Sequence, residues 1–182
     1  MRMKFSLPLF ALAGMAAVLA WPGSGRADIL IRDPAMLAPA TPLADEVLVI
    51  KSERRLLLLR EGQILREFEI MLGLQPEGHK QREGDFRTPE GRYLLDFRNQ
   101  DSDFFLSIRV SYPDENDRRL AAALGVNPGG QIMIHGLPNI RRYPEHYYLS
   151  QDWTEGCIAV SDADMIDIWL MTRANTPIEI RP

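Results

Sequence analysis

The chain contains one cysteine, and a histidine that could act as its base lies upstream. Cys157 follows Gly156 at the start of an apolar run, and His135 ends the apolar segment 132–134. A thiol attacks far better as the thiolate, and a neighbouring imidazole can take its proton. If the fold brings the two side chains together, the pair could serve as the nucleophile and the base of a cysteine enzyme.

Glycines beside these two residues could supply the remaining parts of such a site. The imidazole needs an acceptor for its second nitrogen, and the carbonyl of Gly136 is a plausible one. The amides of Gly156 and Cys157 could form an oxyanion hole, because glycine permits the turn that exposes them. These residues are the candidate catalytic groups: Cys157, His135, Gly136 and Gly156.

Residues near the pair are candidates for substrate binding. Trp153 could line a groove, and Arg141 could bind a substrate carboxylate, although a solvated loop position is the plainer interpretation. The expected substrate-binding set is Trp153, Thr154, Glu155, Arg141 and Tyr143.

Each feature also has an interpretation without chemistry. A lone cysteine at the head of an apolar strand is often a buried filler, and His135 could simply end a strand. A metal site built from Cys157, His135 and His146 matches no zinc spacing, so no metal is expected.

The first 27 residues have the three parts of a secretory signal peptide. Arg2 and Lys4 precede a mostly apolar stretch over residues 5–20, and Gly25 and Ala27 supply small residues at the cleavage site. A secreted protein with one thiol cannot form an internal disulfide. We therefore expect a periplasmic or cell-envelope protein with no membrane attachment once the signal (1–27) is removed; an uncleaved anchor is the alternative.

The remainder reads as a short lead-in followed by one domain. Residues 28–45 are rich in proline and alanine and predict an extended linker, and residues 46–182 are long enough for one core. The formal net charge is −4, and no basic cluster occurs. This balance argues against nucleic acid and anionic membranes as partners. A monomer is expected.

The sequence predicts about eight short strands and two helices that do not alternate as βαβ units, which indicates a domain made mainly of strands. Polar segments 73–91 and 137–151 are predicted loops, where we expect the shape of the substrate site to be set. The predicted helices span 116–124, ended by Gly125, and 161–173, begun by Ser161. The predicted strands span 46–51, 54–60, 64–72, 92–97, 105–111, 131–135, 157–160 and 177–181.

These segments resemble a known family. His135-Gly136 and the later segment Thr154-Glu155-Gly156-Cys157 resemble the catalytic motif of the L,D-transpeptidases (the YkuD-type domain), which is His-Gly, a loop, then Ser/Thr-x-Gly-Cys. The resemblance covers residues 46–181. Further similar motifs follow in the same order, at 84–91, 108–113, 128–130 and 176–178.

The resemblance implies a mainly β domain, a mixed β-sandwich or barrel-like L,D-transpeptidase catalytic domain with two or three short helices and no cofactor. It implies that Cys157 is the nucleophile, His135 the base and Gly136 the ring acceptor, with oxyanion amides at Gly156 and Cys157. Thr154 fills the Ser/Thr position.

The implied partners are peptidoglycan stem peptides, and the implied reaction is a 3–3 cross-link made through a thioester. This would place the protein in cell wall biogenesis and cell shape. A hydrolase using the same cysteine and histidine, and a wall-binding module without activity, remain alternatives.

Two positions depart from the family pattern. Glu155 stands where histidine is common, and Ala159 stands where arginine is frequent. A carboxylate beside the thiolate would raise the pKa of the thiol, unless the imidazole is protonated. Both departures concern the acceptor and the substrate more than the nucleophile.

Overall fold

A computed structural model describes residues 41–182 of the chain. The predicted signal peptide (1–27) and residues 28–40 of the predicted lead-in lie outside the described residues. Within the described part, no helix is both long enough and apolar enough to cross a bilayer.

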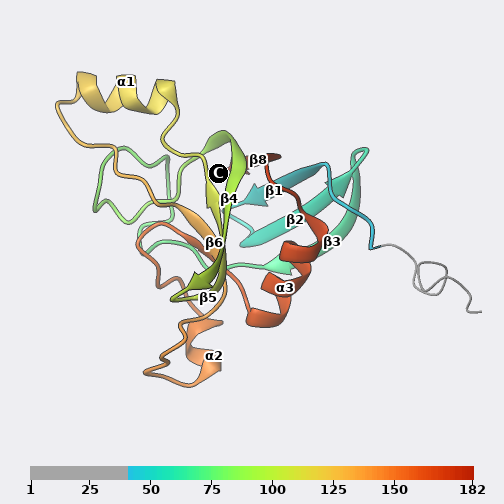
Figure 1. The fold of residues 1–182 in the computed structure, drawn as a ribbon. Coiled ribbons are helices and arrows are strands. Elements are labelled where there is room, and N and C mark those ends of the chain that lie inside the picture. Colours follow the sequence, from blue (N-terminus) through green and yellow to red (C-terminus); the bar gives the residue numbers. More distant parts are fainter. Residues whose placement is uncertain (1–40) are drawn as a thin grey trace, which may run out of the picture. The chain divides into compact units, whose positions relative to one another are not determined.

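Eight strands form one mixed sheet in the order β3-β2-β1-β8-β4-β5-β6-β7 (Figure 1). The pairs β1–β8 and β6–β7 are parallel, and the other neighbours are antiparallel. The strands are β1 (Glu46–Ile50), β2 (Arg55–Arg60), β3 (Gln63–Glu69), β4 (Gly91–Ser102), β5 (Phe105–Val110), β6 (Met133–His135), β7 (Ile158–Ala159) and β8 (Thr176–Arg181).

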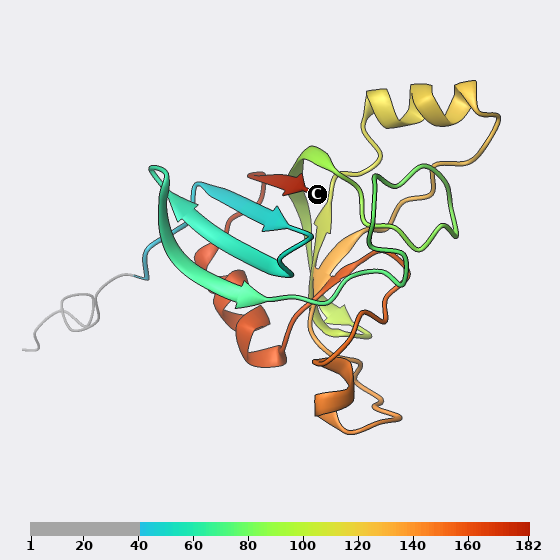
Figure 2. The ribbon, with the colours of Figure 1, turned by 180° about the vertical axis from the view of Figure 1, so that it is seen from behind.

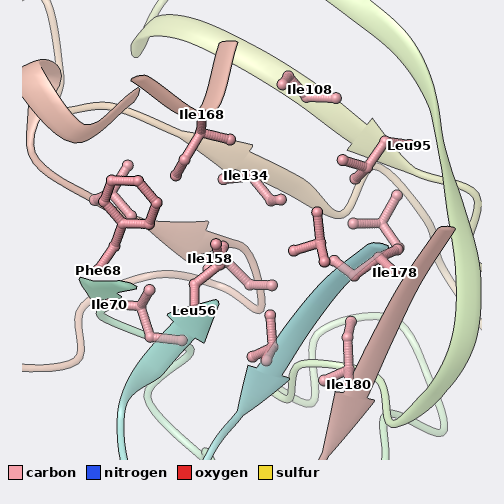
Figure 3. Packing of buried hydrophobic residues seen from close by; sticks show 14 of the residues in the cluster. Leu56, Phe68, Ile70, Leu95, Ile108, Ile134, Ile158, Ile168, Ile178 and Ile180 are labelled. Atoms are coloured by element: carbon pink, nitrogen blue, oxygen red, sulfur yellow. The ribbon is translucent and has the colours of Figure 1, made fainter. Parts of the chain in front are cut away.

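Alternating apolar residues turn one face of this sheet into the core. Val47 and Val49 of β1 are fully buried, and Ile178 and Ile180 of β8 are nearly so. Successive side chains on a strand point to opposite faces, so residues two apart share the same core. Figure 3 shows such residues from strands along the sheet packed around Ile168 of the helix α3 (Asp162–Met171).

The sheet curls, and the segment that follows one edge strand, β3, forms isolated bridges with the region of the other edge strand, β7. Just beyond β3, Met71 and Ala159 exchange backbone hydrogen bonds of 2.9 and 2.8 Å, and Gly73 bridges to Thr154. These contacts join the end of β3 to β7, at opposite ends of the strand order. The curled sheet is a half-barrel with three short helices, which confirms the predicted mainly β, barrel-like fold.

The helices cover different parts of the domain. The helix α3 packs against β5 and β6, and Ser161 caps it by accepting a hydrogen bond from the Asp164 amide at 3.1 Å. The helix α1 (Glu115–Ala123) begins with a capping box and ends before Gly125, whose φ of 68° fits the predicted left-handed position. The helices α1 and α2 (Glu145–Tyr148) lie at opposite ends of the domain (Figures 1 and 2).

Most helix and strand ends lie within three residues of the predicted ones, and two differences are larger. The helix α2 lies inside the predicted loop 137–151; it has one turn and no side-chain cap, so no periodic pattern marks it. The strand β4 runs to Ser102 rather than ending at Phe97. Its polar second half pairs with β5 across two register shifts, which break the alternation that would have revealed it.

Candidate active site

The parallel pair β6–β7 places Cys157 beside the strand that carries His135. Ile134 lies opposite Ile158 and His135 opposite Ala159. Cys157 immediately precedes β7, so the same register sets it beside Met133. Because residues two apart on a strand share a face, Met133 and His135 point to the same side of the sheet.

A pocket of about 600 Å³ opens on this face. His135 and Cys157 both line it, together with Trp153, Thr154 and Glu155 from the predicted substrate-binding set. The end of β4 and the turn after it add Ser102, Asp103 and Phe104, and the segment before β6 adds Gln131. Sequence reasoning missed these four; Ser102, Asp103 and Phe104 come into the site only through the long, bulged β4.

The imidazole of His135 is held tightly. It is 3% exposed and packs against two aromatic rings that also contact each other, with centroid distances of 4.6 Å to Phe104 and 5.7 Å to Trp153. Its Nδ1 lies 2.7 Å from the carbonyl oxygen of Gly136. A carbonyl only accepts, so this bond places the proton on Nδ1 and leaves the Nε2 lone pair free.

Burial controls the charge of this ring. It lowers the pKa of His135 to about 4, although the bond to Gly136 partly opposes the shift. The imidazole is therefore neutral at neutral pH and is able to accept a proton on Nε2.

Cys157 is half-buried, and its thiol donates to the carbonyl of Gln131 at 3.5 Å. Burial raises the pKa of the thiol; a hydrogen bond with the Met133 backbone and the charge of Lys80 oppose this, and Glu155 adds to it. The resting pair is therefore a neutral thiol and a neutral imidazole.

A tight turn holds the cysteine. The Thr154 hydroxyl donates to the carbonyl of Cys157 at 2.8 Å and accepts from the Gly156 amide at 3.1 Å. Gly156, expected to aim its amide at the substrate, is thus engaged inside the turn. A side chain here would be strained at a φ of 128°, and its Cβ would lie 2.6 Å from the carbonyl oxygen of Arg87.

A second pocket, of about 520 Å³, meets the first at the cysteine. Cys157, Glu155 and Gln131 line both pockets. Lys80 from the 73–91 segment lines the second one and is itself 3% exposed. It pairs with Asp85 at 2.8 Å, and its charge acts to lower the pKa of the Cys157 thiol.

The structure does not bring the other predicted substrate contacts to either pocket. Arg141 pairs with Glu145 at 2.8 Å and with Asp162 at 2.5 Å, and Tyr143 stacks on Tyr147 at 4.3 Å. His146 lies on α2, away from the other two members of the metal site considered from the sequence. Within residues 41–182 no group of three or more ligand side chains could hold a metal ion.

Sequence comparison connects this geometry to known proteins. The model of the L,D-transpeptidase catalytic domain family (YkuD) matches residues 44–180. The chain is 38% identical over 95 residues to an Escherichia coli (strain K12) protein named "Putative L,D-transpeptidase YafK". That match covers 48% of this chain and 36% of the relative, so the chain spans about a third of that protein.

Solved structures of related proteins have a similar fold. The helical cell shape determining protein Pgp2 from Campylobacter jejuni has a TM-score of 0.54 at 26% identity, over 74% of this chain and 46% of that one. An L,D-transpeptidase from Stackebrandtia nassauensis has a TM-score of 0.50 at 11% identity, over 75% of this chain and 56% of that one, and supports the fold alone. Because the family model spans most of the chain, this protein belongs to the L,D-transpeptidase catalytic domain family.

Proposed function

We propose that this protein is a periplasmic cysteine L,D-transpeptidase that acts on the tetrapeptide stems of peptidoglycan. One observation carries the proposal: the only cysteine of the chain shares a pocket with a buried imidazole whose Nδ1 is already engaged. Family membership supports peptidoglycan as the substrate class. The proposed chemistry needs no cofactor.

The first half-reaction forms a thioester. The Cys157 thiol turns away from the Gln131 carbonyl and passes its proton to Nε2 of His135. The sulfur attacks the carbonyl carbon of the amide between the L-centre of the third stem residue and the terminal D-alanine. The carbon–nitrogen bond breaks, and His135 returns the proton to the departing amine.

The second half-reaction transfers the acyl group. An amine of a neighbouring stem attacks the thioester and gives a proton to His135. The carbon–sulfur bond breaks, and the thiolate of Cys157 takes that proton back. The product is a 3–3 cross-link between diaminopimelate residues. The two pockets that meet at Cys157 offer space for a donor on one side and an acceptor on the other.

The proposed location is the periplasm, reached through the predicted signal peptide (1–27). The similarity to Pgp2, a protein described as determining helical cell shape, supports a role in shaping the wall. We propose that the protein works there as a monomer on stem peptides.

The test is a digestion profile. Purified protein lacking residues 1–27 is incubated with muropeptides that carry tetrapeptide stems, and the products are separated and weighed. The proposal expects cross-linked dimers and free D-alanine, both absent with Cys157→Ala. Shortened monomers without dimers would show that the enzyme hydrolyses the stem and does not transfer it to an acceptor amine. Binding without turnover, unchanged in Cys157→Ala, would leave a wall-binding module.

A further inference from the structure

The peptide unit between Gly136 and Leu137 lies between two side chains. Its carbonyl oxygen accepts from Nδ1 of His135 at 2.7 Å, and its N–H donates to Oδ1 of Asp162 at 2.8 Å. The C=O and N–H of one peptide are fixed in a common plane by resonance. The carboxylate of Asp162 and the imidazole of His135 are therefore joined through a single planar group.

Through this peptide, the charge of Asp162 can affect His135 electrostatically as well as fix its position. A carboxylate that accepts from the peptide N–H makes a charge-assisted bond. That bond polarises the peptide and makes its carbonyl oxygen a better acceptor, because hydrogen bonds in a chain strengthen one another. A better acceptor at Gly136 favours the tautomer with its proton on Nδ1 and supports the imidazolium that forms during proton transfer.

Asp162 is itself held in place. It is the first residue of α3, where the helix dipole favours a negative charge. Its second oxygen, Oδ2, accepts from Arg141 at 2.5 Å, and Arg141 also donates to Glu145 at 2.8 Å. Gly136 allows the close approach, because a Cβ at this position would lie 2.7 Å from Oδ1 of Asp162.

The geometry points to Asp162 as a positioning residue that acts on His135 through the Gly136–Leu137 peptide, with Arg141 holding the carboxylate. This inference rests on the proposed role of His135 as base. It assigns Arg141 to the support of the imidazole, in place of the substrate contact expected from the sequence. Asp162 touches neither Cys157 nor the pocket, so it is not a catalytic residue in this account.

The first experiment reads the ring directly and needs no enzyme activity. The full mature protein is labelled with ¹⁵N in histidine, and the ring nitrogens of His135 are followed by NMR against pH. Variants are Asp162→Ala, Asp162→Asn and the control Asp164→Ala, which removes an acid from the same helical turn. The other acids at the pocket, Asp103 and Glu155, are the same in all variants.

We expect Asp162→Ala to lower the pKa of His135 further and to populate the Nε2–H tautomer. Asp162→Asn keeps an acceptor oxygen without the charge and should give an intermediate result. Asp164→Ala should titrate like the wild type. If Asp162→Ala and Asp164→Ala titrate alike, the inference is overturned. If Asp162→Ala does not fold, Asp162→Asn and Arg141→Gln are compared with the wild type instead. Titration of His135 that is unchanged in both variants then overturns the inference.

The second experiment measures the rate at which a carbapenem acylates Cys157 in the same variants. A charge-assisted bond lost from the base should slow acylation by about ten- to a hundredfold in Asp162→Ala. Asp164→Ala should match the wild type. No acylation of the wild type, with the NMR changes present, would overturn the proposed function while leaving the coupling between Asp162 and His135. Rapid acylation of Asp162→Ala would overturn the inference alone.

Discussion

Two segments flank the candidate site, and they reach it in different ways. The 73–91 loop touches the second pocket, where Lys80 acts on the sulfur of Cys157. The 137–152 arm contributes no residue to either pocket and is tied to His135 through the peptide that Asp162 holds. The charge near the Cys157 sulfur and the peptide that holds His135 therefore depend on separate parts of the chain.

The two segments are also anchored differently. The 73–91 loop is anchored by the buried Lys51, which follows β1. Lys51 donates to the carbonyls of Gly78 at 2.7 Å and Thr88 at 3.1 Å and pairs with Glu90 at 2.7 Å. In the arm, the Arg141–Asp162 pair is about a third exposed, at 34% and 30%. Buried pairs are costly to break and exposed pairs contribute little, so the arm should open more easily than the loop.

The largest effect is expected where the 73–91 loop presses on the turn of Cys157. In Gly156→Ala the new Cβ would lie 2.6 Å from the Arg87 carbonyl oxygen at a strained φ of 128°. Backbone strain alone costs about 1–3 kcal/mol. We expect acylation by a carbapenem to fall by more than about a hundredfold, in line with that strain plus the clash.

The matched control is Gly62→Ala in the turn between β2 and β3. Gly62 also has a positive φ, 76°, but a Cβ there would meet nothing within 4 Å. It should lose stability without losing acylation rate. If Gly156→Ala is acylated as fast as Gly62→Ala, the contact between the 73–91 loop and Gly156 does not control the reactivity of Cys157.

The next prediction compares how much each of the two anchors contributes to the free energy of unfolding. Lys51→Met leaves Glu90 and two carbonyls without their cation, and breaking such a pair costs about 3 kcal/mol or more. Arg141→Gln breaks a partly exposed pair and should cost less than about 1 kcal/mol. Urea unfolding curves of the two variants measure the difference. Equal losses would contradict the contrast between a buried anchor and an exposed one.

The pH dependence of stability tests the burial of the His135 imidazole. The pKa of His135 is about 4 in the folded protein and 6.5 ordinarily, so between these values the unfolded chain binds more protons. The free energy of unfolding should therefore fall as the pH drops from 6.5 to 4, by up to about 3 kcal/mol from this residue. Urea unfolding of wild type and His135→Gln at pH 7 and pH 4.5 isolates the contribution. An equal loss in both proteins would contradict it.

The smallest effects are expected from the charges next to the sulfur. Glu155→Gln removes an anion that raises the pKa of Cys157, so the pKa should fall and alkylation by iodoacetamide at neutral pH should become faster. The double variant Lys80→Met with Asp85→Asn removes a cation that lowers it, so alkylation should become slower. Each change should stay below about tenfold, which corresponds to one pKa unit. Changes of the same sign in both variants would contradict this assignment.

Much of the domain could be predicted from the sequence, because strand patterns and the two reactive residues are local features. The alternating burial in β1 and β8 follows directly from burial of one face, and Ser161 and Gly125 mark helix ends by their own chemistry. The order of strands in space, with β8 between β1 and β4, has no local signal.

The parts that escaped prediction depend on contacts between distant segments. The Gly156 amide meets the Thr154 hydroxyl rather than the pocket, and Arg141 meets Asp162 across 21 residues of chain. Ser102 and Asp103 reach the pocket only because β4 continues through two bulges. Residue type suggested a role for Arg141, but only the fold shows its partner.

The central claim is that Cys157 is a nucleophile activated by His135, and intact-mass spectrometry after incubation with a carbapenem tests it most directly. Attack on the β-lactam carbonyl opens the ring without loss of atoms, so the protein should gain the mass of one whole carbapenem. The adduct should map to Cys157, be absent in Cys157→Ser and form far more slowly in His135→Gln. A wild-type protein of unchanged mass, or an adduct that forms equally fast without His135, would contradict the account.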